Sequence, residues 1–487
     1  MQTLEDGLSE KKGVDRRQFL MSGVATGAAL GLGGAMAQAA PAKTAAPKPN
    51  IVLYLSDQFR WDFLGANGLN GSTRTPNLDT LAASGKNFSY TVTNQPVCAP
   101  ARSVLLTGRY ATETGVWHNG LGMSQTLPTL ATELHKAGYS TNLIGKWHLA
   151  PNTEGPGFVK PEWRGGFMDL WEGSNALEHT THPYEGTIYD GDGKEITYKD
   201  QYRVDFITDR AERFLRQKHD KPFLLFISQL EPHQQNDMDN RIIGPKGSVE
   251  RFQNSYVPPD LRNLPGNWQQ ELPDYYGACE AIDASVGRVR KILEEEKLAD
   301  NTIFVFFSDH GCHFMTRNQE YKRSVHNASS RIPLLIHGPG FENAQHITQM
   351  TGIIDITPTL LEAAGIAVPA TIKGTSLLPL LRDEKARADW PNEHLIQISE
   401  SMTGRAIRTK DWTYCVAEIT GTTNQQAAAV YQEYQMYDQR NDPYEQVNLA
   451  GRKEFRKQAD ELQAKLKKLI VAAGEPEPEI RPAKLYP

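Results

Sequence analysis

Short apolar runs alternate with longer amphipathic segments along most of this sequence, and this alternation restricts its fold more than any other feature. The apolar runs that predict buried strands are residues 51–55, 139–144, 223–230, 302–308 and 332–337. Strands that alternate with helices in this way form a mostly parallel sheet with helices on both faces. We therefore expect an α/β fold built on one large, mostly parallel sheet.

The amphipathic segments between the strands carry the signals of helix ends. Thr75 and Pro76 favour a helix start, and Gly85 favours its end. The same kind of pattern predicts further helices at residues 127–137, 203–218, 272–298 and 357–364. These segments are the ones expected to cover the sheet.

The pattern changes after residue 382. Short strand-like pieces, a polar loop and a closing helix follow, at residues 395–399, 405–408, 412–416, 421–428 and 452–471. We expect the large α/β domain over residues 50–382 and a smaller α+β subdomain over residues 383–487. A chain of 487 residues can bury such a core without staples, and its four cysteines exclude a disulfide-dense scaffold.

The first 39 residues predict an export signal rather than a part of the fold. Arg16 and Arg17 precede a Gly/Ala-rich run at residues 21–36, and residues 37–39 (Ala-Gln-Ala) form a small-residue cleavage site. This order resembles a bacterial twin-arginine signal peptide, followed by a Pro/Ala-rich linker at residues 40–49. No later stretch is long and apolar enough to span a bilayer. We expect a periplasmic or secreted protein without a membrane anchor.

The charge balance narrows the class of partner. The chain has 52 Lys and Arg against 58 Asp and Glu, which gives a net charge of −6. A general affinity for nucleic acid is typical of basic surfaces, so we expect no nucleic-acid partner. An anionic ligand is still compatible with this charge, because its recognition needs only a local positive pocket.

Polar clusters follow four of the predicted strands directly. They are Ser56-Asp57-Gln58, Gly145-Lys146-Trp147-His148, Glu231-Pro232-His233 and Ser308-Asp309-His310-Gly311. The carboxyl ends of parallel strands share one edge of a sheet, and ligands bind at that edge. We expect these four clusters to meet in one pocket.

The residue types in these clusters point to two functions. Hard oxygen ligands with one imidazole suit a divalent cation, with Ca²⁺ as the first expectation and Mg²⁺ or Mn²⁺ as alternatives. The candidate metal ligands are Asp57, Gln58, Asp309 and His310. Lys146, His148 and His233 suit the binding of an oxyanion and the protonation of a leaving group.

One local motif identifies a family. Residues 97–110 read VCAPARSVLLTGRY, and Cys98-Ala99-Pro100-Ala101-Arg102 with Leu106-Thr107-Gly108 resembles the signature of type I sulfatases. The segments at residues 139–148, 308–311 and 437–449 are similar to three further segments of that family. The resemblance covers residues 49–450 and implies the alkaline-phosphatase-like fold, with a formylglycine-dependent sulfatase activity.

The resemblance also implies the chemistry of Cys98. In that family the motif cysteine is oxidised to formylglycine by a formylglycine-generating enzyme, and the aldehyde reacts as its hydrate. One hydroxyl attacks sulfur, and the second then expels sulfate and regenerates the aldehyde. A thiol or a serine would keep a covalent ester without this exit. Pro100 and Arg102 belong to the recognition sequence for the modification.

The other roles follow by position in the family motifs. Arg102 would lie near the formylglycine hydroxyls, Lys146 and Lys322 would bind sulfate oxygens, and His148 would contact formylglycine or sulfate. His233 would protonate the leaving alcohol. Arg323 is the alternative to Lys322, because the two are neighbours in the same segment.

Two positions depart from the family pattern. Gln58 stands where the first metal segment commonly has Asp, and His310 stands where the second often has Asn. These changes resemble the choline-sulfatase and phosphonate-monoester-hydrolase branch, and they leave the metal and the preference for sulfate or phosphodiester open. Of the other cysteines, Cys312 is expected to pack, and Cys279 and Cys415 are expected to be structural, with a disulfide between them left open.

The substrate is inferred from the expected export and from residues 308–326. This segment is similar to carbohydrate sulfatases of polysaccharide-degrading bacteria, which implies a sulfated oligo- or polysaccharide such as the algal glycan ulvan. Candidate sugar-binding residues are His118, Arg317 and His326, with Trp117, His179 and His182 as further candidates. Two alternatives stand beside this hypothesis: a phosphonate or phosphate diester hydrolase, and a non-catalytic protein that binds sulfated glycans.

Overall fold

The computed structural model describes residues 47–421 and 425–486. The expected export signal at residues 1–39 lies outside the described residues, as do most of the expected linker and part of the polar loop at 421–428. Between residues 47 and 486, leaving out 422–424, no helix is long and apolar enough to cross a membrane.

Five parallel strands form the centre of a ten-stranded sheet. Their order is β9 (Thr302–Ser308), β1 (Asn50–Ser56), β8 (Phe223–Gln229), β4 (Ser140–Lys146) and β5 (Trp171–Ser174). Antiparallel pairs with β11 (Leu334–His337) and β6 (Glu185–Asp190) begin the two outer parts of the sheet. The outermost strands are β2 (Lys86–Phe88), β12 (Gln345–Ile347) and β7 (Glu195–Lys199). The expected α/β fold is confirmed, although the outer parts of the sheet include antiparallel pairs.

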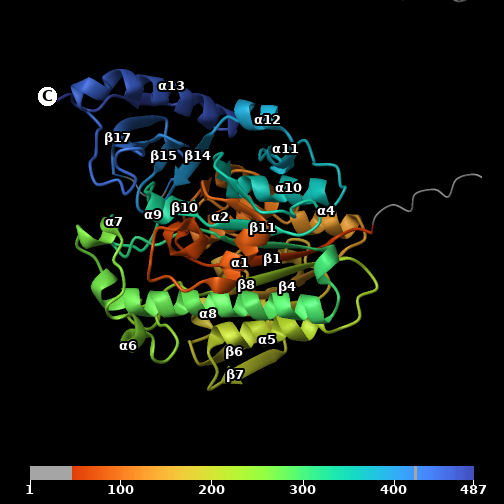
Figure 1. Cartoon of the computed structure of the whole chain (residues 1–487). Coiled ribbons are helices and arrows are strands. Elements are labelled where there is room, and N and C mark those ends of the chain that lie inside the picture. Colours follow the sequence, from red (N-terminus) through yellow and green to blue (C-terminus); the bar gives the residue numbers. More distant parts are fainter. Residues whose placement is uncertain (1–46, 422–424, 487) are drawn as a thin grey trace, which may run out of the picture. The chain divides into compact units, whose positions relative to one another are not determined.

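Helices cover both faces of this sheet, because alternate residues of each central strand point to opposite sides. In β1, Ile51, Leu53 and Leu55 pack into one core, and Val52 and Tyr54 pack into the other. The first core contains α2 (Cys98–Thr107), α4 (Leu130–Lys136) and α10 (Ile356–Ala363). The second contains α1 (Pro76–Ser84), α5 (Arg203–Leu215) and α8 (Trp268–Glu295). Figure 1 shows α5 and α8 on one side of the strands and α2, α4 and α10 on the other.

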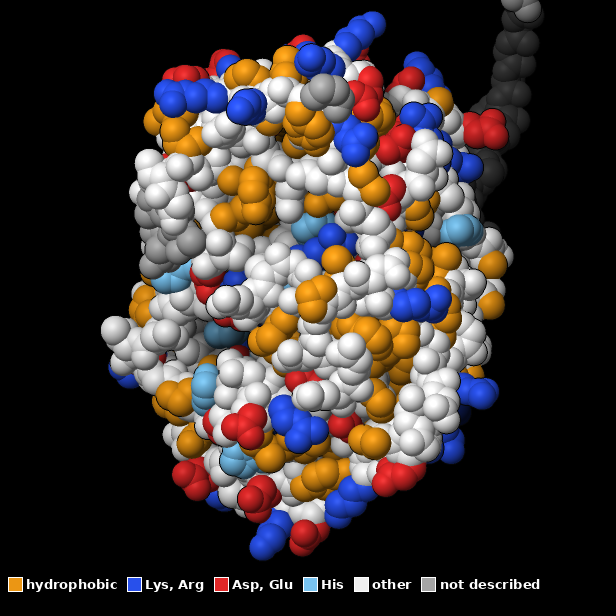
Figure 2. Space-filling model, turned by 90° about the vertical axis from the view of Figure 1, so that its left-hand side faces the viewer, with side chains coloured by type: hydrophobic (Ala, Val, Ile, Leu, Met, Phe, Trp, Pro, Cys, Tyr) orange, Lys and Arg blue, Asp and Glu red, His pale blue; other side chains and the backbone are white. Residues whose placement is uncertain are grey.

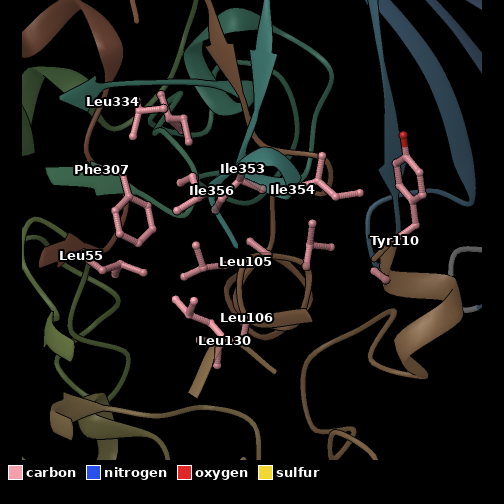
Figure 3. Close-up of a cluster of buried hydrophobic side chains, with 14 of the residues drawn as sticks. Leu55, Leu105, Leu106, Tyr110, Leu130, Phe307, Leu334, Ile353, Ile354 and Ile356 are labelled. Atoms are coloured by element: carbon pink, nitrogen blue, oxygen red, sulfur yellow. The ribbon is translucent and has the colours of Figure 1, made fainter. Parts of the chain in front are cut away.

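The helix α2 is central to the first core. In Figure 3, Leu105 of this helix faces the segment that carries Ile353, Ile354 and Ile356, and Leu106 lies beside Leu130. All of these side chains are nearly or completely buried. The packing therefore fixes the helix, and with it the residues in its first turn, against the carboxyl ends of the strands.

A second, five-stranded sheet lies in the C-terminal part of the chain. Its strands are β14 (Glu393–Ile398), β15 (Gly404–Thr409), β16 (Trp412–Glu418), β17 (Val430–Asp438) and β18 (Glu479–Arg481). The first four pair antiparallel, and α13 (Arg456–Ala472) packs on this sheet through Leu462, Leu466 and Ile470. Strands and a closing helix are present as expected; the boundary between residues 382 and 383 stays a prediction.

Several boundaries differ from the prediction. The expected strand at 332–337 is divided at Pro333, which has no N–H to donate to a strand partner. Its first part, β10 (Arg331–Ile332), joins a small sheet with β3 (Thr91–Val92) and β13 (Thr351–Gly352). The helix expected at 127–137 begins only at Leu130, because the Thr129 side chain caps it by accepting from the Thr132 N–H.

Short helices complete the fold. The helices are α3 (Ala111–Thr114), α6 (Ser248–Phe252), α7 (Pro259–Arg262), α9 (Asn327–Ser330), α11 (Leu378–Arg382) and α12 (Glu384–Asp389). The disulfide left open between Cys279 and Cys415 is absent, because both thiols are free and pack in different hydrophobic clusters.

Candidate active site

The four predicted polar clusters meet at one edge of the main sheet. The strands that precede them, β9, β1, β8 and β4, are direct neighbours in the sheet and run parallel. Their carboxyl ends therefore bring Asp309, Asp57, His233 and Lys146 together from distant parts of the sequence. In Figure 2, which looks onto one side of the molecule, Lys or Arg and His side chains lie recessed in hollows near the middle of the face.

Cys98 is the first residue of α2 and lies at the centre of this edge. Its Sγ is 2.9 Å from Lys322 Nζ, 3.3 Å from His310 Nε2 and 3.7 Å from Asp57 Oδ1. Burial raises the pKa of the Cys98 thiol, but Lys146, Lys322 and His310 outweigh it and hold that pKa well below its usual value. The position therefore stabilises a negatively charged group.

Arg102 follows Cys98 by four residues, so both side chains lie on the same face of the helix. The Arg102 guanidinium donates from Nη2 to Asp57 Oδ2 at 3.1 Å and from Nη1 to Ser228 Oγ at 2.8 Å. Lys146 Nζ donates to the same Asp57 oxygen at 2.9 Å. The motif spacing thus links the helix to the ends of three strands, and the surrounding cations hold the pKa of Asp57 well below its usual range in spite of burial and the nearby Cys98.

The expected metal ligands form a cluster of suitable composition. Asp57, Cys98, Asp309 and His310 each offer one ligand atom, and these atoms lie within 4.8 Å of one another. The buried oxygens Asp309 Oδ2 and Gln58 Oε1 accept no hydrogen bond within the described chain. His310 Nδ1 lies 3.0 Å from Gly311 O, which leaves Nε2 directed at the cluster. Arg102 Nε forms a long ion pair with Asp309 Oδ2 at 3.4 Å. Oxygens without a hydrogen bond beside an oriented imidazole fit a divalent cation with a preference for oxygen ligands.

Electrostatics and backbone geometry support the same interpretation. Burial and the neighbouring Asp57 raise the pKa of Asp309 to about 6, so the paired carboxylates lack full compensation by protein cations. Gln58 has a φ of 72°, a left-handed conformation that is costly for this residue type. Its N–H donates to Asp309 Oδ1 at 3.2 Å, and Tyr275 Oη donates to its carbonyl at 2.7 Å. These bonds hold the strained residue at the cluster.

His233 and Lys322 face each other on the opposite side of Cys98. Lys322 Nζ lies 2.7 Å from His233 Nε2, and His233 Nδ1 lies 2.6 Å from the Gln234 carbonyl. Burial and the Lys322 charge lower the pKa of His233, so the ring is neutral, with Nδ1 donating and Nε2 accepting. Arg323 instead pairs with Glu320 at 2.8 Å and Glu400 at 2.5 Å. The geometry favours Lys322 over Arg323 as the cation at Cys98.

His148 lies beside this group in a left-handed conformation, with a φ of 66°. Its side chain is within hydrogen-bonding reach of Cys98, and its Nδ1 has no partner in the described chain. The predicted set of Cys98, Arg102, Lys146, His148, His233 and Lys322 is therefore brought together, and its catalytic roles stay predictions.

A cavity of about 210 Å³ opens onto three of these residues, and sequence reasoning missed part of its wall. Cys98, His233 and Lys322 line it together with Asn119, Glu178 and Gln234. Glu178 belongs to a 3₁₀ turn, Leu177–His179, that follows β5, and its Oε1 lies 3.1 Å from Lys146 Nζ. The neighbouring His179, a predicted candidate, is exposed. Recognition of the short strand Trp171–Ser174 would have pointed to the residues after it.

The other predicted sugar-binding residues do not line this cavity. Arg317 donates from both Nη atoms to the Tyr444 and Glu445 carbonyls at 2.9 Å, and His326 lies between Ser324 Oγ and Tyr437 Oη. Both instead border a separate cleft of about 470 Å³ beside β16 and β17. His118 contacts the Asn119 carbonyl and Trp117, and His182 pairs with Asp237 near the surface.

Comparisons with known proteins cover nearly the whole described chain. The Sulfatase family model matches residues 49–366, and the model for the C-terminal part of N-sulphoglucosamine sulphohydrolase matches residues 319–472. The chain is 34% identical to the ulvan-active sulfatase of Formosa agariphila, over 88% of this chain and 82% of that one. It is 26% identical to the N-acetylglucosamine-6-O-sulfatase of Bacteroides thetaiotaomicron, over 87% and 86%. A solved structure from Bacteroides fragilis, assigned to the sulfatases as YidJ, superposes with a TM-score of 0.75 at 25% identity, over 89% and 98%.

Proposed function

The chain belongs to the sulfatase family and is a sulfuric ester hydrolase, and we propose that it hydrolyses sulfate esters of a carbohydrate at a formylglycine made from Cys98. The position of Cys98 carries this proposal. The residue faces the cavity from the first turn of a buried helix, with Lys322 Nζ at 2.9 Å and His310 Nε2 at 3.3 Å. Lys322, which can bind an anion, and the cluster with His310, which can bind a cation, therefore meet at Cys98, the residue of the sequence signature.

Formylglycine supplies, in its hydrated form, a hydroxyl that attacks sulfur and a second hydroxyl whose proton loss releases sulfate. Arg102 and Lys146 hold the Asp57 carboxylate in place at 3.1 and 2.9 Å, next to this position. Lys322 Nζ lies 2.9 Å from Cys98 Sγ and Lys146 Nζ binds Asp57 beside it, so both cations would compensate the charge that develops on the sulfate oxygens. A formylglycine-generating enzyme is the partner that the modification requires.

The cluster of Asp57, Gln58, Asp309 and His310 would hold a divalent cation, and we propose Ca²⁺ because oxygen donors predominate. When bound, such a cation polarises sulfate oxygens and lowers the pKa of a hydroxyl at position 98. Asp309 Oδ2 and Gln58 Oε1 accept no hydrogen bond in the described chain, which supports this assignment.

The pair of His233 and Lys322 suits the leaving alcohol. His233 Nε2 lies in the cavity and accepts from Lys322 Nζ at 2.7 Å while Nδ1–H donates to the Gln234 carbonyl. A proton of the Lys322 ammonium can pass to Nε2 and from there to the departing oxygen, because both heavy atoms are already in hydrogen-bonding contact. The neutral ring is ready to receive that proton.

The names of the relatives support a glycan as the substrate. One acts on ulvan and another on N-acetylglucosamine 6-O-sulfate, and both are matched over more than four fifths of their length. We propose a sulfated oligo- or polysaccharide of the ulvan type, reached after twin-arginine export to the periplasm or beyond.

The test compares sulfate release with phosphodiester cleavage. Purified, formylglycine-bearing protein is incubated with ulvan oligosaccharides, other sulfated glycans, an aryl sulfate and an aryl phosphodiester. We expect sulfate release from at least one glycan, with a higher kcat/KM than diester cleavage. Faster diester cleavage without sulfate release would favour the diester hydrolase, and glycan binding without release would favour the non-catalytic alternative.

A further inference from the structure

Two buried acceptor oxygens without partners line the cavity next to Cys98. They are Glu178 Oε2 and Gln234 Oε1, and neither accepts a hydrogen bond from the described chain. Glu178 is 3% exposed and Gln234 is 4% exposed. Buried polar atoms in folded proteins almost always have a partner, so two orphans in one cavity indicate that a ligand supplies the donors.

Glu178 keeps its charge in this position. Burial raises the pKa of its carboxyl, but Lys146, His148 and His233 lower it to about 2. The carboxylate uses only Oε1 for Lys146, at 3.1 Å, and Oε2 stays available to the cavity. A charged acceptor makes a stronger hydrogen bond to a hydroxyl than a neutral one does.

The chemistry of these atoms determines which ligand fits. The wall offers two acceptor oxygens without partners, one of them negative, so this part of it suits hydroxyl donors. A phenol ester has no such hydroxyls. Glu178 Oε1 binds Lys146 at 3.1 Å, and we place the sulfate group at Lys146, so Oε2 would face the ring position next to the ester.

We propose that Glu178 is a specificity-determining residue that accepts a hydrogen bond from the hydroxyl beside the sulfate ester, with Gln234 accepting from a second hydroxyl. The pair selects a polyhydroxylated sugar ring over an aryl group. This inference rests on the proposed function, because it assigns the sugar that occupies the same cavity.

The test measures discrimination between paired substrates. The probes are monosulfated methyl pyranosides, each paired with an analogue that lacks the hydroxyl next to the ester, and an aryl sulfate. For wild type we expect loss of this hydroxyl to lower kcat/KM by about 10- to 100-fold, as for a lost bond to a charged group. The discrimination ratio is kcat/KM for the pyranoside divided by kcat/KM for its analogue without the hydroxyl. In Glu178→Gln this ratio is expected to fall by roughly tenfold, since a neutral acceptor remains.

A matched variant and a second substitution separate recognition from structure. Glu154 also pairs with a lysine, Lys160 at 2.7 Å, but lies outside the residues that line the cavity, so Glu154→Gln should keep the wild-type ratio. Glu178→Asp retains the charge and should keep a higher ratio than Glu178→Gln. Thermal melting of each variant establishes that folded variants are compared with folded wild type in the kinetic assays.

The outcomes distinguish this inference from the proposed function. If Glu178→Gln lowers kcat/KM equally for a pyranoside and its deoxy analogue, Glu178 acts through Lys146 alone and the inference is wrong. If wild type shows no preference for the hydroxyl, the inference is also wrong although sulfate release from sugars stands. Turnover of the aryl sulfate with no sugar sulfate hydrolysed would instead overturn the carbohydrate substrate.

Discussion

Cys98 and Arg102 lie one helical turn apart in α2 and converge on the same carboxylate. Cys98 Sγ is 3.7 Å from Asp57 Oδ1, and Arg102 Nη2 is 3.1 Å from Asp57 Oδ2. The four-residue spacing of the motif is therefore a geometric requirement, because only residues three or four apart share a face of a helix. A change of the spacing would separate Cys98 from the guanidinium that binds Asp57.

Replacement of the nucleophile is the first prediction. Cys98→Ala should abolish sulfatase turnover while the thermal melt stays close to that of wild type, since it removes the reactive group and little volume. Activity and melting temperature are measured on the same preparation. Cys415→Ala, at another buried cysteine, is the matched control and should retain turnover. Activity near wild type in Cys98→Ala would exclude formylglycine chemistry at this position.

The second prediction distinguishes two neighbouring cations. Lys322→Ala should lower kcat/KM about 100- to 1,000-fold, as expected for removal of a donor that stabilises transition-state charge. Arg323→Ala should have a much smaller effect, because that guanidinium pairs with Glu320 and Glu400. Steady-state kinetics on an aryl sulfate measure both. The reverse order of effects would assign the sulfate-binding role to Arg323.

Removal of the metal is the third prediction. Chelation should abolish activity and lower the melting temperature, because a cation that binds only the folded site stabilises it by mass action. Added Ca²⁺ should restore both. In Asp309→Asn the melting temperature should respond less to Ca²⁺, since one carboxylate of the cluster is gone. Full activity after exhaustive chelation, in protein shown to be free of metal, would contradict the proposed site.

The fourth prediction concerns the pH dependence of stability. Burial raises the pKa of Glu271 from its ordinary value near 4.5 to about 7. Tyr321 Oη lies 2.8 Å from Glu271 Oε1 and 2.7 Å from the Asn240 carbonyl, and its single proton serves one of them. A protonated Glu271 can donate to Tyr321 while Tyr321 donates to Asn240.

The sign of the effect follows from proton binding. Between pH 4.5 and 7 the folded state binds this proton and the unfolded state releases it, so stability falls as pH rises through this window. Gln imitates the protonated carboxyl, so Glu271→Gln should match wild type near pH 5 and exceed it near pH 8. Urea unfolding at both pH values measures the difference. An equal difference in unfolding free energy between Glu271→Gln and wild type at the two pH values would exclude Glu271 as the titrating group.

Much of the fold was predictable because its central strands are buried on both faces. Strands of this kind form continuous apolar runs, and the run at 302–308 coincides with β9. Polar residues directly after such runs predicted the pocket, since topology alone places the ends of neighbouring parallel strands together. The α2 helix was less visible, because Pro100 lies in its first turn, where proline is tolerated but suggests a loop.

The rest of the site depends on contacts that no local pattern records. Glu178 follows β5, a strand of only four residues, and its role depends on Lys146 from another strand. His326 has the residue type of a ligand-binding side chain, yet Ser324 and Tyr437 occupy both of its ring nitrogens. Residue type predicted the chemistry available, and the three-dimensional neighbours decide which side chains are free to use it.

The proposed function depends on the conversion of Cys98 to formylglycine, which then performs the hydrolysis. Mass spectrometry of the tryptic peptide at residues 87–102, from protein made with and without a formylglycine-generating enzyme, tests it most directly. We expect an aldehyde in place of the thiol at Cys98, with sulfatase turnover proportional to the converted fraction. Full turnover from protein in which Cys98 is entirely thiol would contradict it.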